Sequence, residues 1–483
     1  MHRRNFVKLS LVSATYLLSA CNAGESSSNK SANLDGFLIN QALSIPPLLD
    51  PIPDVNGVKQ FNLNIEERTH NFYTDVASNT FGINQSYLGN TLRIKNGDKV
   101  SINYTNKLQE ATTMHGHGMH VPASMDGGPN QRIEPNTTWS AIYTINQKAS
   151  TNWYHPHLMG KTAEHVYKGL TGLIILEDSQ SDVLALPKTY GKDDIPLVIQ
   201  DRNFLNKQLS YTPVAHDIMR GYRGDVLLTN GQIQPKLNAK AGLLRLRILN
   251  GSNGSLYNFS FSDGRVFSQI ATDNSFLESP VELTSLKLSP SERAEIVVDL
   301  ANDANGEVLL KVVELIDNRS FTALSISVDS QAALVSTLPS SLTTHEVIDI
   351  NQVVRTRNFT LEGSGNGGNP ILTINNKAML MSRIDETLNV NELEIWHIEN
   401  TMNLNHNFHI HATHFRPYKR NGSTANILAN EQGYKDCIHL GPNETVDILV
   451  KMLDYTDASG KYMYHCHYLE HEDAGMMGQF VVV

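Results

Sequence analysis

The stretch "MYHCHYLEHEDAGMMGQF", residues 463–480, places one of the three cysteines of the chain between two histidines. Successive side chains of an extended strand point to opposite faces, so His465 and His467 share one face while Cys466 points to the other. His471 and Met476 follow Cys466 at plus five and plus ten. The stretch therefore predicts a strand whose two faces serve two different sites.

Three other short motifs repeat the His-x-His pattern, in "MHGHGMH" (114–120), "WYHPHLMG" (153–160) and "HNFHIHATHF" (406–415). Most of the 19 histidines crowd into residues 115–165 and 397–471, a distribution that structural histidines would not need. Neutral imidazoles without carboxylate or thiolate suit a borderline transition metal, and copper more than magnesium or calcium. Eight of them exceed the needs of one ion and fit three coppers with two, three and three ligands. By strand alternation the eight are His115, His117, His155, His157, His409, His411, His465 and His467.

The opposite face of the Cys466 strand predicts a second kind of copper site. Two histidines, a thiolate and a weak axial methionine form a blue-copper electron-transfer centre, and His406 and His471 can supply the two imidazoles. Met476 and Met477 compete for the axial position. Two cysteines of an exported protein would pair by default, but these neighbours favour Cys466 as a ligand and leave Cys437 as a free, buried thiol.

Length and composition indicate a globular protein of several domains. The chain has 483 residues, 40% hydrophobic and 18% charged, and its net charge of −10 argues against nucleic-acid binding. Short β-rich runs such as "LLRLRILNGS" alternate with turns, and the theme recurs three times at intervals of ~150 residues. We predict an all-β fold of three β-sandwich domains, at 36–180, 190–332 and 345–483. The middle domain has no metal-ligand spacing and is expected to set the geometry of the other two.

Residues 1–35 have the features of an export signal followed by a tether. "HRRNFVK" and the apolar run after it resemble a twin-arginine signal, and the run is too short to span a membrane permanently. "LSAC" ends at Cys21 and resembles a lipoprotein cleavage site, with a plain cleavable signal as the alternative. We expect a monomer in the periplasm, anchored through a lipid on Cys21, or else soluble in the periplasm or secreted.

The four histidine motifs in this order, with "DGGP", "IPLVIQDRNF" and "LEHEDAGMMGQF", resemble the multicopper oxidase family, in its branch of bacterial laccases and copper-efflux oxidases. The resemblance implies cupredoxin-like Greek-key domains and about four copper ions per chain. No other cofactor is implied. It places a trinuclear cluster between domains 1 and 3, and type 1 copper in domain 3. The implied ligands are His406, Cys466, His471 and Met476 for type 1; His115 and His409 for type 2; His117, His155 and His467 for one type 3 copper; and His157, His411 and His465 for the other.

The resemblance also implies a reaction. Electrons from a phenolic or other aromatic donor, or from Cu(I) or Fe(II), would pass through Cys466 and reduce O₂ to water. Asp126 and Glu472 match positions that supply protons in the family. Asp126 could equally hold a histidine ring, and Glu472 could be a solvated charge.

Departures from the family pattern bear on the substrate. Gly116 stands where relatives often carry Trp, and the chain has no methionine-rich insertion that would support Cu(I) oxidation specifically. Two other functions remain open on sequence alone: a lipid-tethered copper-binding or electron-carrier protein without O₂ chemistry, and a structural envelope factor without copper. His120 and His414, off the His-x-His pattern, are expected to be structural, and His165 and His439 are expected to be surface or core residues.

Overall fold

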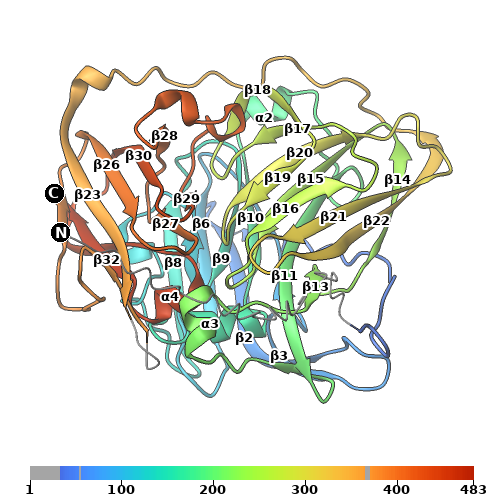
Figure 1. The fold of residues 1–483 in the computed structure, drawn as a ribbon, viewed down its shortest axis with the longest axis horizontal. Helices are drawn as coiled ribbons and strands as arrows, with labels where there is room; N and C mark the ends of the chain where they lie inside the picture. Colours follow the sequence, from blue (N-terminus) through green and yellow to red (C-terminus); the bar gives the residue numbers. More distant parts are fainter. Residues whose placement is uncertain (1–32, 54–55, 365–369) are drawn as a thin grey trace, which may run out of the picture.

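The computed structural model describes residues 33–53, 56–364 and 370–483, so the predicted export signal and Cys21 lie outside the described residues. The described chain forms six β-sheets that pack in pairs, which confirms the predicted all-β fold of three sandwiches. In Figure 1 the third domain (orange and red) and the second (yellow and green) lie on either side of the blue strands of the first. Within the described residues no helix is long and apolar enough to cross a membrane.

The first domain pairs a six-stranded sheet with a four-stranded sheet. Strand β2 alternates buried and more exposed residues, with Phe61, Leu63 and Ile65 fully buried, as expected of a strand with one face on a core. The six-stranded sheet comprises β1 (Ile52–Pro53), β2 (Lys59–His70), β3 (Ser78–Ile83), β4 (Leu88–Gly89), β6 (Lys99–Asn106) and β8 (Thr138–Thr144). The four-stranded sheet comprises β5 (Leu92–Lys95), β7 (His115–His117), β9 (Ser150–His155) and β10 (Gly172–Glu177).

The second domain pairs a seven-stranded sheet with a five-stranded sheet around its own core. The first sheet comprises β11 (Asp194–Leu205), β12 (Gln208–Ser210), β13 (Val226–Thr229), β15 (Leu243–Asn250), β17 (Phe267–Ala271), β18 (Phe276–Leu283) and β20 (Arg293–Asp299). The other comprises β14 (Lys236–Ala241), β16 (Tyr257–Phe261), β19 (Leu286–Leu288), β21 (Glu307–Glu314) and β22 (Arg319–Ala332).

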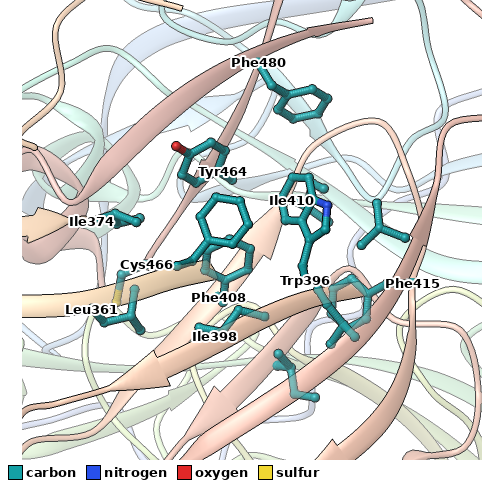
Figure 2. Packing of buried hydrophobic residues seen from close by; sticks show 14 of the residues in the cluster. Leu361, Ile374, Trp396, Ile398, Phe408, Ile410, Phe415, Tyr464, Cys466 and Phe480 are labelled. Carbon is teal, nitrogen blue, oxygen red and sulfur yellow. The ribbon is translucent and has the colours of Figure 1, made fainter. Parts of the chain in front are cut away.

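The third domain pairs two five-stranded sheets, and its core is rich in aromatic rings (Figure 2). Phe408 stacks on Tyr464 at 5.8 Å between ring centroids, and Cys466 belongs to the same core. One sheet comprises β23 (Val353–Ser364), β24 (Ile371–Ile374), β26 (Leu393–Asn400), β28 (Arg416–Arg420) and β30 (Thr445–Lys451). The other comprises β25 (Glu386–Leu388), β27 (His406–Ile410), β29 (Cys437–Leu440), β31 (Asp457–His465) and β32 (Met477–Val482).

The three domains repeat one pairing scheme, as the recurring sequence theme predicts. In each, the first long strand pairs parallel with a later strand, which pairs antiparallel with the next: β2·β6·β8, β11·β15·β20 and β23·β26·β30. Parallel neighbours need a crossover connection, so each domain folds back over its own core. Bridges join Ile39 to Ile233 and Ala42 to Lys236, which ties residues just after position 36 to the second domain. The domain boundaries remain predictions.

In the described part of the chain, four short helices lie in the connections between strands: α1 (Thr162–Lys168), α2 (Ser179–Val183), α3 (Ala215–Arg220) and α4 (Leu469–Asp473). Short 3₁₀ turns occur at η1 (Ala123–Met125), η2 (Ile350–Gln352), η3 (Thr424–Asn426) and η4 (Ala429–Glu431). Helix α4 begins shortly after β31 and Cys466, and it packs against α1 and α3. It thereby brings His471, which lies within α4, next to the first and second domains.

Candidate copper centres

The four histidine motifs lie at the ends of facing strands of the first and third domains. His115 pairs with His155 across β7 and β9, and His409 pairs with His465 across β27 and β31. Alternation within a strand holds for β7, whereas β9 and β31 end at the first histidine of their motif. The second histidine of those motifs therefore belongs to the following loop, a detail that the sequence pattern did not predict. All eight cluster histidines have at most 1% of their surface exposed.

Ring nitrogens of the six histidines that the resemblance implies for the type 3 coppers lie close together in two groups. In one, His465 Nε2 lies 3.2 Å from both His157 Nε2 and His411 Nε2. In the other, His155 Nε2 lies 3.4 Å from both His117 Nδ1 and His467 Nε2.

The two histidines predicted for type 2 copper each have a buried ring nitrogen that is free to bind a ligand. His115 Nε2 and His409 Nε2 are buried nitrogens without a hydrogen-bond partner. Their rings lie 6.0 Å apart between centroids. Both nitrogens therefore remain available to a ligand in the same enclosed space.

The donor set fits cations at these positions. His465 Nδ1 is directed to the Cys466 carbonyl at 3.1 Å and His411 Nδ1 to Asp126 Oδ2 at 2.7 Å, so each of these outer nitrogens carries the hydrogen. Their Nε2 lone pairs then face each other and cannot hydrogen-bond. Burial lowers the pKa of His115 to about 4 and that of His465 to about 3, so the rings stay neutral at pH 7. Buried, neutral imidazoles with facing lone pairs are suited to bind copper ions.

The Cys466 site lies directly after the end of β31, and the Cys466 side chain packs in the third-domain core. Cys466 Sγ lies 3.5 Å from the Nδ1 atoms of both His406 and His471, and these two nitrogens are 3.1 Å apart. The side chain of Cys466 belongs to the third-domain core (Figure 2), while His465 and His467 face the cluster. Cys466 and its two neighbouring histidines thus belong to different clusters, but the predicted strand through all three is wrong, because β31 ends at His465. Neither Cys466 nor Cys437 forms a disulfide among the described residues.

The outer nitrogens of both type 1 histidines are occupied. His471 Nε2 donates to the Met219 carbonyl at 3.2 Å, and His406 Nε2 is directed to the Met402 sulfur at 3.1 Å. Both Nδ1 atoms therefore present lone pairs to Cys466. Burial raises the pKa of the Cys466 thiol to about 12, so a thiolate here requires a bound cation. The site fits copper for the same reason as the cluster.

The structure distinguishes the two candidate axial methionines by their packing. Met476 is fully buried in the core that contains Cys466, and its carbonyl accepts from the Cys466 amide at 3.1 Å. Met477 lies opposite His465 and packs with Met379 and Met463. Only Met476 therefore packs in the same core as Cys466.

Two buried carboxyls predicted from the sequence lie beside the cluster. Asp126 Oδ2 accepts from His411 Nδ1 at 2.7 Å, and its carbonyl accepts from His115 Nδ1 at 2.7 Å. Glu472 is fully buried, with its carboxyl oxygens 3.2 Å from His157 Nδ1 and 3.3 Å from His465 Nδ1. The alternative of a solvated Glu472 does not hold. Burial raises the pKa of both carboxyls well above the ordinary values, because it penalises the charged form.

Several polar groups near the cluster were not anticipated from the sequence. Asp436 accepts from His117 Nε2 at 2.9 Å, and Arg293 of the second domain forms two hydrogen bonds with that carboxylate at 2.7 Å each. Neither residue lies in a histidine motif. Met219 and Met402, which cover the type 1 histidines, also carry no local signal.

The off-pattern histidines have hydrogen-bond partners outside the cluster. His120 Nδ1 donates to the Ala412 carbonyl at 2.7 Å, and His414 Nε2 to the Gly118 carbonyl at 2.9 Å. His165 Nδ1 lies 3.1 Å from Thr112 Oγ1, and His439 Nε2 lies 3.0 Å from Asn405 Oδ1. These contacts fit the expected structural roles.

Three cupredoxin-like sandwiches with a Cys-His junction between two ligand clusters define the class of copper-dependent oxidases. Family descriptions of multicopper oxidases match residues 64–181 and 342–483. The chain is 38% identical over 454 residues to the multicopper oxidase mco of Staphylococcus aureus, covering 93% of this chain and 94% of that protein. The protein belongs to the multicopper oxidase family.

Two further relatives show the range of proteins to which the chain is similar. A solved structure of the laccase-like multicopper oxidase CueO from the lignin-degrading bacterium Ochrobactrum sp. matches with a TM-score of 0.84 and 33% identity, covering 91% of this chain and 100% of that one. The chain is also 36% identical over 457 residues to the cell division protein FtsP of Sodalis glossinidius, covering 91% of this chain and 92% of that protein. The similar proteins thus include both named oxidases and a named cell division protein. The detailed function therefore has to be argued from the copper site of this chain.

Proposed function

We propose that this oxidase takes single electrons from a reducing substrate at the type 1 site and uses four of them to reduce O₂ to water at the eight-histidine cluster. The observation that carries the proposal is the position of Cys466. Its sulfur faces His406 and His471, while its neighbour His465 contacts His411 and its neighbour His467 contacts His155 in the two different groups. A through-bond path of one residue in each direction therefore joins the electron-accepting site to both halves of the cluster.

Bound copper would supply the redox chemistry, and the residues around it would supply order and protons. His406, Cys466, His471 and Met476 would hold type 1 copper, and the eight cluster histidines would hold three more, which gives about four ions per chain. Asp126 and Glu472 are buried carboxyls beside ring nitrogens of four ligands, and burial raises the pKa of both, so they are the groups suited to carry protons to the cluster. Proton delivery from fixed carboxyls is the role that general acid catalysis requires of them.

Helix α3 covers His471 and thereby limits which electron donors can approach the type 1 site. His471 is fully buried, and the outer edge of its ring meets the Met219 carbonyl on α3. We infer that the donor reaches the site across α3, without direct contact with the ring. Small donors such as Cu(I) or Fe(II), or a compact phenol, fit this arrangement better than a bulky aromatic polymer. Steady-state rates with Fe(II), Cu(I) and a dimethoxyphenol on the copper-loaded enzyme will rank these donors.

Metal analysis with oxygen uptake tests the proposed function. About four coppers per chain with donor-dependent O₂ consumption supports it, as complete ligand sets imply. One copper without O₂ uptake would indicate the electron-carrier alternative, and no copper after copper-supplied expression would indicate a structural envelope factor. Replacing Cys466 by Ser should abolish the blue absorbance and all donor oxidation. Phenol oxidation that survives this change would disprove the electron path.

We further propose that the protein works in the periplasm as a lipoprotein anchored through Cys21, the arrangement suggested by the sequence of residues 1–35. Membrane fractionation of the wild type and Cys21→Ala tests the anchor. Release of the variant from the membrane is expected, and equal membrane retention of both would leave the plain cleavable signal as the better explanation.

A further inference from the structure

Asp436 holds two predicted copper ligands at once. Its carboxylate Oδ1 accepts from His117 Nε2 at 2.9 Å, and its peptide carbonyl accepts from His409 Nδ1 at 2.8 Å. The rings of His117 and His409 stack at 3.8 Å between centroids with an interplanar angle of 9°. One residue thus fixes a stacked pair that joins a predicted type 3 ligand of the first domain to a predicted type 2 ligand of the third.

Asp126 repeats this arrangement on the opposite pair of ligands. Its carbonyl accepts from His115, its carboxylate accepts from His411, and these two rings stack at 3.9 Å with an angle of 19°. The cluster is therefore framed by two aspartates in equivalent positions. Each clamps one histidine from the first domain against one from the third.

The two aspartates differ in their partners. Arg293 meets Asp436 in a bidentate pair, with Nη1 to Oδ1 and Nη2 to Oδ2 both at 2.7 Å. Both residues are fully buried, and geometry of this kind is the strongest that a carboxylate can make with a side chain. Asp126 has no such cation, and its Oδ1 lacks any hydrogen-bond partner.

Arg293 also joins the three domains at this point. It lies at the start of β20 in the second domain, and its Nε donates to the Thr151 carbonyl of the first domain at 2.8 Å. Its Nη2 donates to Asn152 Oδ1 at 3.0 Å. A Cβ added at Gly118, beside His117, would lie 2.6 Å from Asp436 Oδ2 and 2.7 Å from Arg293 Nη2. Arg293 and Asp436 therefore pack directly against the backbone at Gly118, just after β7.

We propose that Arg293 and Asp436 form a positioning pair through which the copper-free second domain fixes the ring of His117 and the His117–His409 stack. His117 is the cluster histidine that turns Nδ1 inward, whereas the other seven face neighbouring ligands with Nε2 or leave Nε2 without a partner. A carboxylate on His117 Nε2 keeps the hydrogen there and leaves Nδ1 as the donor atom. Loss of Arg293 would leave Asp436 buried without its counter-charge and free to move. The inference rests on the copper ligands assigned above.

The test compares two buried arginines of the second domain in the copper-loaded enzyme. Arg293→Gln removes the proposed function, and Arg247→Gln is the matched control. Arg247 is buried, pairs with Asp194 and Glu295, and also reaches Thr151, but none of its partners is a predicted ligand. Asp436→Asn, which keeps the size and an acceptor oxygen, serves as the second variant. The readouts are copper per chain, the type 2 electron paramagnetic resonance spectrum, the near-ultraviolet absorbance of the coupled type 3 pair, and the blue absorbance.

We expect Arg293→Gln and Asp436→Asn to retain the blue absorbance while they bind cluster copper about 10- to 100-fold more weakly, with altered type 2 and type 3 spectra. Arg247→Gln should lower stability and leave those spectra unchanged. Unchanged cluster spectra in Asp436→Asn would overturn the proposal, as would equal spectral changes in Arg293→Gln and Arg247→Gln. Because these readouts do not need turnover, a wild type that binds copper without reducing O₂ would disprove the proposed function and leave this test valid.

Discussion

Glu472→Gln is the sharpest test of how protons reach the cluster. Glu472 has no exposed surface, and its two oxygens approach the Nδ1 atoms of His157 and His465 at 3.2 and 3.3 Å. The amide keeps the shape of the side chain and its neutral charge, but it cannot deliver a proton at an accessible pKa. Loss of a positioned general acid costs about 10²- to 10⁴-fold in rate. That range corresponds to about 3–5 kcal/mol in activation free energy.

Two separate rates locate the effect. Anaerobic bleaching of the blue absorbance by the donor measures electron entry and should be unchanged, because Glu472 is not in the type 1 site. Steady-state O₂ uptake should fall by the full factor, with copper content unchanged. Burial raises the pKa of Glu472, so its proton is present below that raised value and is lost as the pH rises through it. The wild-type rate should therefore decline on the alkaline side, and this decline should weaken in the variant.

Glu470→Gln provides the control on the same helix. Glu470 is also buried, but it accepts from the Tyr222 amide at 2.9 Å and from Asn253 Nδ2 at 2.9 Å and does not contact a ligand histidine. The Glu470→Gln variant should have a lower free energy of unfolding, and its O₂ rate per copper-loaded molecule should stay within a factor of a few of the wild-type rate. The proton-donor role of Glu472 would be refuted by wild-type O₂ uptake in Glu472→Gln, or by an equal loss in both variants.

Three other substitutions probe separate parts of the molecule. Met402→Asp should lower the reduction potential of the type 1 site, because a carboxylate on His406 Nε2 donates more electron density than the Met402 sulfur. A redox titration of the blue absorbance measures this potential, and equal potentials in Met402→Asp, Met402→Leu and the wild type would contradict the prediction. Gly118→Ala should deplete cluster copper but keep the blue absorbance, because φ of Gly118 is 79° and the new Cβ would lie 2.5 Å from Asn152 Oδ1. A full complement of cluster copper in this variant would show that the backbone can adjust. Phe259→Ala, in the second-domain core, should lower the free energy of unfolding by about 3–5 kcal/mol in urea without changing the visible spectrum; an altered spectrum would mean that the core and the copper sites are coupled.

The candidate ligands could be predicted from the sequence because the pattern that marks them is one of local spacing. Alternation of extended backbone predicts different sides for Cys466 and for His465 and His467. The structure separates them in this way, although β31 ends at His465 and the other two residues lie in the following loop. The sandwich fold followed for a similar reason, since buried and exposed positions alternate along strands such as β2 and β14. Features of period two are written in neighbouring residues and need no knowledge of tertiary pairing.

The outer partners of the ligands could not be found in this way. Asp436 and His117 are 319 residues apart, and Arg293 comes from a domain without a ligand motif. Arginine near the start of a strand has many ordinary uses, so nothing local marks Arg293. The same holds for Met219, whose contribution is a backbone carbonyl that any residue could offer. Contacts made across domains by single polar groups become visible only when the domains are packed together.

The two aspartates that frame the cluster show why the second domain matters to chemistry it does not perform. Both make the same pair of hydrogen bonds to stacked histidines, yet their charges are set differently. Burial alone raises the pKa of Asp126 well above its ordinary value, whereas for Asp436 the Arg293 guanidinium outweighs burial and holds the pKa below the ordinary value. Environments that drive the pKa values of two similar groups apart commonly separate their roles. Asp126 is therefore the better suited of the two to exchange a proton and Asp436 to remain charged, and the residue that creates this difference belongs to the domain without a ligand motif.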